Sequence, residues 1–167
     1  FLREPDGMVE NTLSLRRRLV REIRRFRPEV IVAMDPTVMF TPMGGINHPD
    51  HRAVGTATMD AIFPACGQPN LFQEFEKEGF FAHKVRKVYV PSRMQGDTYV
   101  DISRTIDLKI AALQAHVSQV GASEGLEKRI REATASNGAG KEMAHAEIFC
   151  VLTIQNDEAW AKAQANA

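Results

Sequence analysis

The chain has 167 residues, a length that suits one domain with a single hydrophobic core. Its 21 Lys and Arg residues balance its 21 Asp and Glu residues, which argues against a nucleic-acid or membrane-surface partner. No apolar run is long enough to span a bilayer, and two distant cysteines, Cys66 and Cys150, without a secretory signal predict reduced thiols in the cytoplasm.

The chain opens with FLREPDG and without an initiator Met, which we interpret as a strand end and a turn in a piece of a longer protein. A helix is then predicted from Asn11 or Thr12 up to Pro28. Its apolar face repeats at helical spacing through Leu15, Leu19, Ile23 and Phe26. The run EVIVAM at 29–34 predicts a short, buried parallel strand that stops at Asp35.

A second helix is predicted from Pro49 or Asp50 to Ile62, since proline fits the first helical turn. Strands are predicted over 85–91, 98–102 and 147–154. A third helix capped by Ser103 and a fourth over 124–135 lie between the last two strands. This alternation predicts an α/β layered fold with a mostly parallel sheet and one domain over 1–155. The tail over 156–167 is expected to be either a frayed helix or disordered.

The stretch GGINHPDHR at 44–52 places two histidines and an aspartate beside a glycine pair, just beyond the predicted strand end. Neutral imidazole is a good zinc ligand, and a catalytic zinc site needs about three protein ligands and an open position. Asp50 could accept the second N–H of His48 and fix its tautomer. The alternative is that these side chains merely cap a helix.

The motif GGINHPDHRAVG follows RPEVIVAMDP and precedes VDIS, DLKIAALQAHVSQ and AEIFCV. Together these segments resemble the LmbE-like, or PIG-L, family of zinc-dependent N-deacetylases. The resemblance extends from Pro5-Asp6-Gly7 to about Val151 and implies a Rossmann-like α/β fold whose N-terminal strands and helix are missing from this chain.

Residue roles follow from the resemblance position by position. It implies that His51 is a zinc ligand, that His48 stabilises or protonates the tetrahedral species, and that Asp50 orients His48. Asp6 is implied as a substrate contact. Ile46, where some relatives carry an aromatic residue, is a second candidate for substrate binding.

The family's first motif, HPDDE, is absent from this chain. That motif supplies the other zinc ligands and the carboxylate base, so the resemblance implies that these groups lie upstream of Phe1.

A further set of candidates lies on the predicted third helix. Lys109, His116 and Gln119 would share one polar face and could support the site from the second shell of contacts. Glu147, before the last strand, is expected either to pair with a basic residue or to contact substrate.

The resemblance implies a cytoplasmic, zinc-dependent hydrolase that removes the N-acetyl group from an N-acetylglucosamine-type substrate, with homo-oligomer formation left open. One alternative is an amidase of the same fold that cleaves a sugar-linked thiol conjugate. Another is a non-catalytic domain whose first helix, rich in arginine over 16–27, binds an anionic partner.

Overall fold

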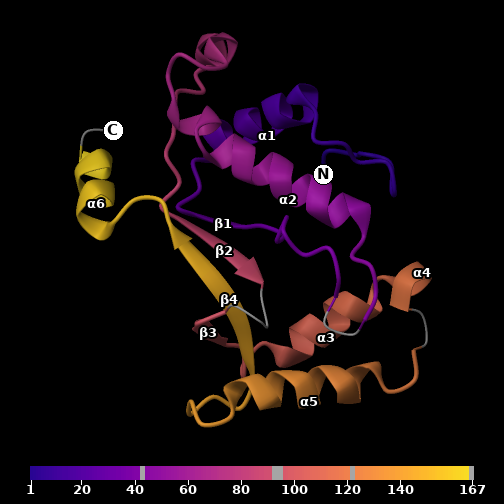
Figure 1. The fold of residues 1–167 in the computed structure, drawn as a ribbon. Helices are drawn as coiled ribbons and strands as arrows, with labels where there is room; N and C mark the ends of the chain where they lie inside the picture. The colour runs from indigo at the N-terminus through magenta and orange to yellow at the C-terminus, as the bar shows by residue number, and fades with distance from the viewer. Residues whose placement is uncertain (42–43, 92–95, 121–122, 166–167) are drawn as a thin grey trace. The chain divides into compact units, whose positions relative to one another are not determined.

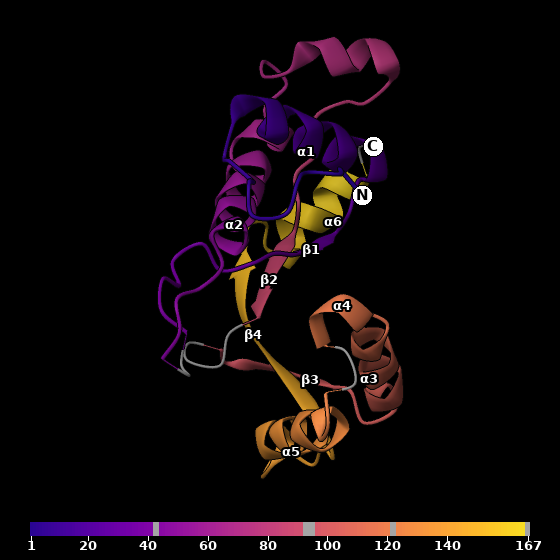
Figure 2. The same cartoon turned by 90° about the vertical axis from the view of Figure 1, so that its right-hand side faces the viewer.

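The computed structural model describes residues 1–41, 44–91, 96–120 and 123–165. The chain forms two compact units, Phe1–Pro91 with Val151–Ala167 and Ser92–Cys150. The first contains α1 (Leu13–Phe26), β1 (Val30–Val32), α2 (Pro49–Ile62), η1 (Ala65–Gly67), η2 (Gln73–Glu78), β2 (Lys87–Pro91) and α6 (Asp157–Ala165). The second contains β3 (Thr98–Asp101), α3 (Ile106–Gln114), α4 (Val117–Val120), α5 (Leu126–Gly138) and the start of β4 (Ala146–Thr153) (Figures 1 and 2).

The α/β class predicted from the sequence is confirmed, with strands in the order β1-β2-β4-β3. β1 and β2 are parallel, with Ile31 opposite Val88. β3 and β4 are antiparallel, with Tyr99 opposite Ile148. The sheet is therefore mixed, because β3 reaches β4 from the opposite direction.

α1 begins where the sequence predicts, because the Thr12 side chain accepts the backbone N–H of Leu15 and so caps the helix. Arg27 ends it in a left-handed conformation, with φ of 50°. Leu15 and Ile23 are buried as expected, but Phe26 is 69% exposed. The buried face of α1 instead includes Val20 and Arg24, which are both fully buried.

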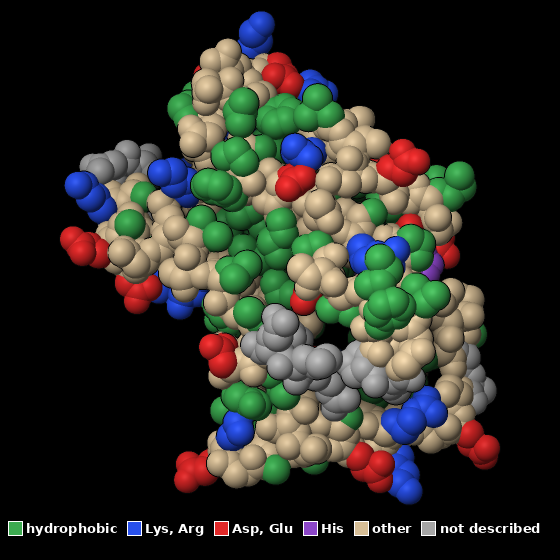
Figure 3. All heavy atoms as spheres, viewed as in Figure 1, with side chains coloured by type: hydrophobic (Ala, Val, Ile, Leu, Met, Phe, Trp, Pro, Cys, Tyr) green, Lys and Arg blue, Asp and Glu red, His purple; other side chains and the backbone are tan. Residues whose placement is uncertain are grey.

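β1 forms in the predicted place, but its burial differs from the prediction. Val30 is 41% exposed and Val32 is 65% exposed, because β2 is the only described strand that pairs with β1. Figure 3 shows hydrophobic side chains gathered along the part of the surface where Figure 1 places β1 and β2.

α2 has the predicted bounds, with Pro49 in its first turn. It lies beside α1 in Figures 1 and 2, and the Arg16 guanidinium of α1 pairs with Asp60 of α2. Gly55 brings α2 against the end of β1, since a Cβ on it would lie 2.7 Å from the Met34 carbonyl oxygen. The glycine in HPDHRAVG therefore allows the helix to approach the strand end closely.

The second unit corrects two predictions. Ser103 does not cap a helix, because its hydroxyl donates to the Asp101 carboxylate and α3 begins later, at Ile106. The expected long third helix is also broken, with α3 ending at Gln114 and α4 starting at Val117. Ile102, Ile106 and Ile110 form the core here, whereas Val117 is 72% exposed.

The remaining differences concern helix ends. α5 continues to Gly138, beyond its predicted end at residue 135. Residues 157–165 of the tail are helical, which agrees with the first of the two predicted alternatives. None of the helices over the described ranges is both long and apolar enough to cross a membrane.

The arginines of α1 are held by neighbouring acidic groups and carbonyls. Their partners are Asp60 for Arg16, Glu74 for Arg17, Glu4 for Arg18, Glu78 and Glu22 for Arg21, and Glu22 for Arg25. Arg24, 1% exposed, donates to five backbone carbonyls between residues 65 and 72. Because these arginines already have partners within the protein, the contacts argue against the alternative that α1 binds an anionic partner.

Candidate active site

The site lies at the carboxyl end of β1, where a loop leads into α2. Asp35 starts the loop as its Oδ1 accepts the backbone N–H of Thr37 at 2.8 Å and its hydroxyl at 2.6 Å. Phe40 and Ile46 form an isolated antiparallel bridge across the loop. These contacts order the loop that precedes Asn47 and His48.

His48 caps α2. Its Nδ1 accepts the backbone N–H of Asp50 at 3.3 Å, and its side chain is 44% exposed. A ring nitrogen that accepts carries no proton, so the neutral ring has its proton on Nε2. His48 therefore presents Nε2–H as a hydrogen-bond donor.

The Asp50 carboxylate, in the first turn of α2, is almost buried at 9% exposure. Its Oδ2 accepts the backbone N–H of Gly7 at 2.6 Å and its Oδ1 that of Val9 at 3.1 Å. The nearest carboxylate oxygen lies 3.9 Å from Nδ1 of His48, too far for the expected hydrogen bond. Asp50 thus holds the amino-terminal segment against the site and meets His48 through its backbone N–H.

His51 lies one turn further along the helix surface from His48, with ring centroids 5.5 Å apart. Its Nδ1 is 3.3 Å from Oδ1 of Asn47. His51 also lines a pocket of about 150 Å³ together with Met34, Asp35, Val38, Asn47 and Pro91. The second histidine of the motif is therefore exposed to a small cavity at the strand end.

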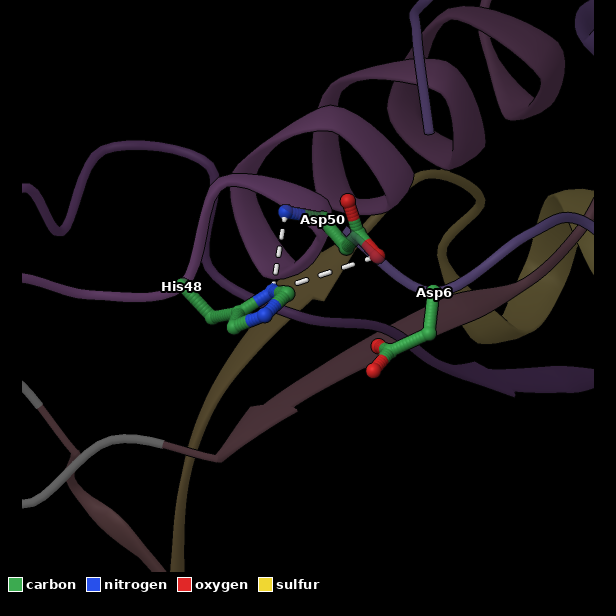
Figure 4. A group of neighbouring side chains, drawn as sticks. All are labelled: Asp6, His48 and Asp50. Atoms are coloured by element: carbon green, nitrogen blue, oxygen red, sulfur yellow. Dashed lines mark hydrogen bonds and ion pairs between the residues drawn. The ribbon is translucent and has the colours of Figure 1, made fainter. Parts of the chain in front are cut away.

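The predicted site residues are brought together in part. Asp6, His48 and Asp50 offer ligand atoms within 4.8 Å of one another (Figure 4). In Figure 4 Asp6 comes from the amino-terminal segment, opposite the start of α2. Ile46 lies in the preceding loop and is 76% exposed.

The hydrogen bonds that these residues already make determine how well they fit a metal ion. Both oxygens of Asp50 already accept backbone N–H groups, and Nδ1 of His48 is used by the helix cap. This group of three is therefore better suited to holding the turn at Asp6 than to binding a metal. His51 fits a metal better, because a ring bonded through Nδ1 keeps the lone pair of Nε2 available.

The candidates on the predicted third helix belong to the second unit. Lys109 donates to Glu147 at 2.5 Å, so the expected pairing of Glu147 with a basic residue is confirmed. His116 lies between α3 and α4 and Gln119 lies in α4, both exposed. The shared face predicted for these three residues is wrong, because the helix ends before His116.

Sequence reasoning assigned no role to Asn47 or Asp35, although both line the pocket with His51. The spacing of Asn47 and His51, four positions apart, was the available signal, since side chains at this spacing can meet at a helix start.

A parallel β-α segment with a histidine-bearing helix start at the strand's carboxyl end is typical of the ligand-binding edge of a Rossmann-like α/β fold. Residues 1–62 match the family described as "PIG-L: GlcNAc-PI de-N-acetylase". The chain thus carries a PIG-L, or LmbE-like, family segment, and the resemblance noted from its motifs is confirmed.

The chain is similar to two proteins that are named as deacetylases. The chain is 32% identical over 114 residues to a diacetylchitobiose deacetylase of Thermococcus kodakarensis, covering 68% of this chain and 40% of that one. It is 29% identical over 133 residues to a 1D-myo-inositol 2-acetamido-2-deoxy-alpha-D-glucopyranoside deacetylase of Rhodococcus jostii, covering 64% and 44%. The chain thus spans less than half the length of these relatives.

A solved structure shares the fold. The N,N'-diacetylchitobiose deacetylase of Pyrococcus horikoshii superposes with a TM-score of 0.77 at 21% identity, over 91% of this chain and 56% of that one.

Proposed function

We propose that the protein is a zinc-dependent hydrolase that removes the N-acetyl group from an N-acetylglucosamine-type substrate. The observation that carries the proposal is the difference between the two motif histidines. His51 is bonded through Nδ1 and keeps Nε2 free of a proton, whereas His48 accepts through Nδ1 and keeps a proton on Nε2.

His51 is the residue of this chain that would hold the metal. Zinc, when bound, supplies activation of water near neutral pH and polarisation of the acetamide carbonyl. Further ligands and the carboxylate base are groups that the family resemblance assigns to its first motif.

His48 would act on the substrate directly. Its Nε2–H can donate to the carbonyl oxygen of the acetamide as that oxygen gains negative charge, and one well-placed donor is worth roughly 100- to 1,000-fold in kcat. Asp6, held beside His48 by the bonds from Gly7 and Val9 to Asp50, would receive a sugar hydroxyl. Ile46, exposed on the loop, would contact the sugar ring.

The substrate class rests on the relatives. Both named relatives act on substrates with an acetamido group on a glucosamine unit that carries a second ring, another sugar or an inositol. We therefore propose an N-acetylglucosamine unit joined to a second group. We also propose a cytoplasmic location, which is supported by the two free cysteines, Cys66 and Cys150.

The test uses the full-length protein, with bound zinc measured by elemental analysis and acetate release from N,N'-diacetylchitobiose and N-acetylglucosaminyl-inositol. His51→Ala is expected to lose zinc and activity together. His48→Ala should retain zinc but lose roughly 100- to 1,000-fold in kcat. Arg25→Ala, which removes an exposed side chain that forms an ion pair with Glu22, is the matched control and should alter neither. Wild-type protein without zinc or acetate release would overturn the proposal.

A further inference from the structure

Asn47 is fixed from three directions. Its Nδ2 donates to the Val38 carbonyl at 2.9 Å, and its backbone N–H donates to the Met39 carbonyl at 2.8 Å. Its own carbonyl accepts the guanidinium of Arg52. These bonds join Asn47 to the middle of the loop that follows β1 and to the first turn of α2, so the Asn47 side chain has little freedom to rotate.

The bond to Val38 also determines which way the amide faces. A carbonyl oxygen can only accept, so the atom beside Val38 must be the NH₂ group, and the atom beside His51 must be Oδ1. Oδ1 can only accept in turn. The neutral His51 ring must therefore carry its proton on Nδ1, which leaves the lone pair on Nε2.

This arrangement is specific to His51. At His48 the partner of Nδ1 is a backbone N–H, which donates and imposes the opposite tautomer on a ring only 5.5 Å away. The two rings therefore have opposite tautomers because each makes a different hydrogen bond at Nδ1.

We infer that Asn47 is the positioning residue of the metal ligand: it holds His51 in the Nδ1–H tautomer with Nε2 ready to bind zinc. This inference rests on the proposed function for the identity of the metal, but the tautomer is a property of the metal-free chain. Both ends of the Asn47 amide are already engaged, with Val38 and with His51, so the role we assign to Asn47 acts through the imidazole alone.

The first measurement is ¹⁵N NMR of the histidine rings in metal-free full-length protein at mildly alkaline pH. Wild-type His51 is expected with a protonated Nδ1 and an unprotonated Nε2, and Asn47→Ala should shift the proton toward Nε2. Asn47→Asp keeps an acceptor oxygen and should preserve the wild-type tautomer. Thr41→Val removes a different bond of the same loop, from the Gly45 N–H to the Thr41 hydroxyl, and should leave the tautomer unchanged.

The second measurement is zinc affinity by competition with a chelating dye. Asn47→Ala is expected to bind zinc about 10- to 100-fold more weakly, with Asn47→Asp restored to within a few-fold of wild type. A wild-type ring protonated on Nε2, or equal zinc affinity in wild type and Asn47→Ala, would overturn the inference. Wild-type protein that binds no zinc would instead overturn the proposed function, while the ring spectra still decide the tautomer.

Discussion

The Asp50 carboxylate accepts the backbone N–H of Gly7 at 2.6 Å, although the two residues lie 43 positions apart in sequence. A second bond, from the N–H of Val9, completes the pair. The motif aspartate therefore fastens the amino-terminal turn beside the histidine that begins α2. Asp50 therefore positions the amino-terminal turn, whereas the sequence predicted that it would bond to the ring of His48.

Replacing Asp50 by Ala should release this turn, because two backbone N–H groups lose their acceptor. We expect the free energy of unfolding to fall by about 1–2 kcal/mol. Urea denaturation measures that change, and hydrogen exchange at Gly7 and Val9 should accelerate more than exchange within α2. Glu74→Ala, which removes an exposed ion pair with Arg17, is the control and should change stability by less than about 1 kcal/mol. Unchanged exchange at Gly7 would contradict the assignment.

Gly55→Ala should destabilise the protein, although alanine is the better helix former by about 1 kcal/mol. The added Cβ would lie 2.7 Å from the Met34 carbonyl oxygen and 3.1 Å from the Pro36 nitrogen, so helix and strand end must separate. We expect a net loss of about 1–3 kcal/mol in thermal or urea denaturation. Thr56→Ala, next along α2, should be close to neutral because its hydroxyl donates within the helix, to the Arg52 carbonyl. A stabilised Gly55→Ala variant would show that α2 does not press on the strand end.

Arg24→Met should be strongly destabilising. The guanidinium is fully buried and donates to the carbonyls of Ala65, Cys66, Gln68, Leu71 and Phe72, so its replacement removes five hydrogen bonds to a charged donor at once. We expect about 3 kcal/mol or more in the free energy of unfolding.

Arg25→Met is the matched control for that change, one position along α1. Its guanidinium is exposed and pairs with Glu22, so we expect a loss below about 1 kcal/mol. Equal effects of the two substitutions in urea denaturation would refute a special role for Arg24.

The free energy of unfolding should decrease as the pH is lowered, because of His83. The ring is 4% exposed, and burial lowers its pKa below the ordinary value of 6.5, with nearby Arg27 lowering it further and the hydrogen bond to the Pro28 carbonyl opposing the shift. The unfolded chain takes up a proton that the folded ring resists. The stabilisation is therefore present above the unfolded pKa and is lost as pH falls through the folded pKa.

Urea denaturation across mildly acidic pH measures this dependence. His83→Gln retains a donor for the Pro28 carbonyl but does not titrate, so its stability should decline less steeply than that of wild type. Parallel pH curves for the two proteins would exclude His83 as the cause.

Local sequence determined much of this protein. The cap at Thr12, the bounds of α2 with Pro49 in its first turn, and the alternation of helices and strands all follow from short-range preferences of the chain. The motif HPDH likewise indicated the candidate site, since it places side chains that can bind a metal or transfer a proton close together in the sequence.

Only the tertiary structure decided how those side chains are used. The acceptors of Gly7 and Val9 lie more than 40 positions away, and the fixed amide of Asn47 depends on a carbonyl across a loop. The exposure of β1, the break before His116 and the burial of Arg24 depend in the same way on which segments pack together. Periodicity reports the face of a single element, whereas hydrogen-bond partners and burial are set by contacts between distant ones.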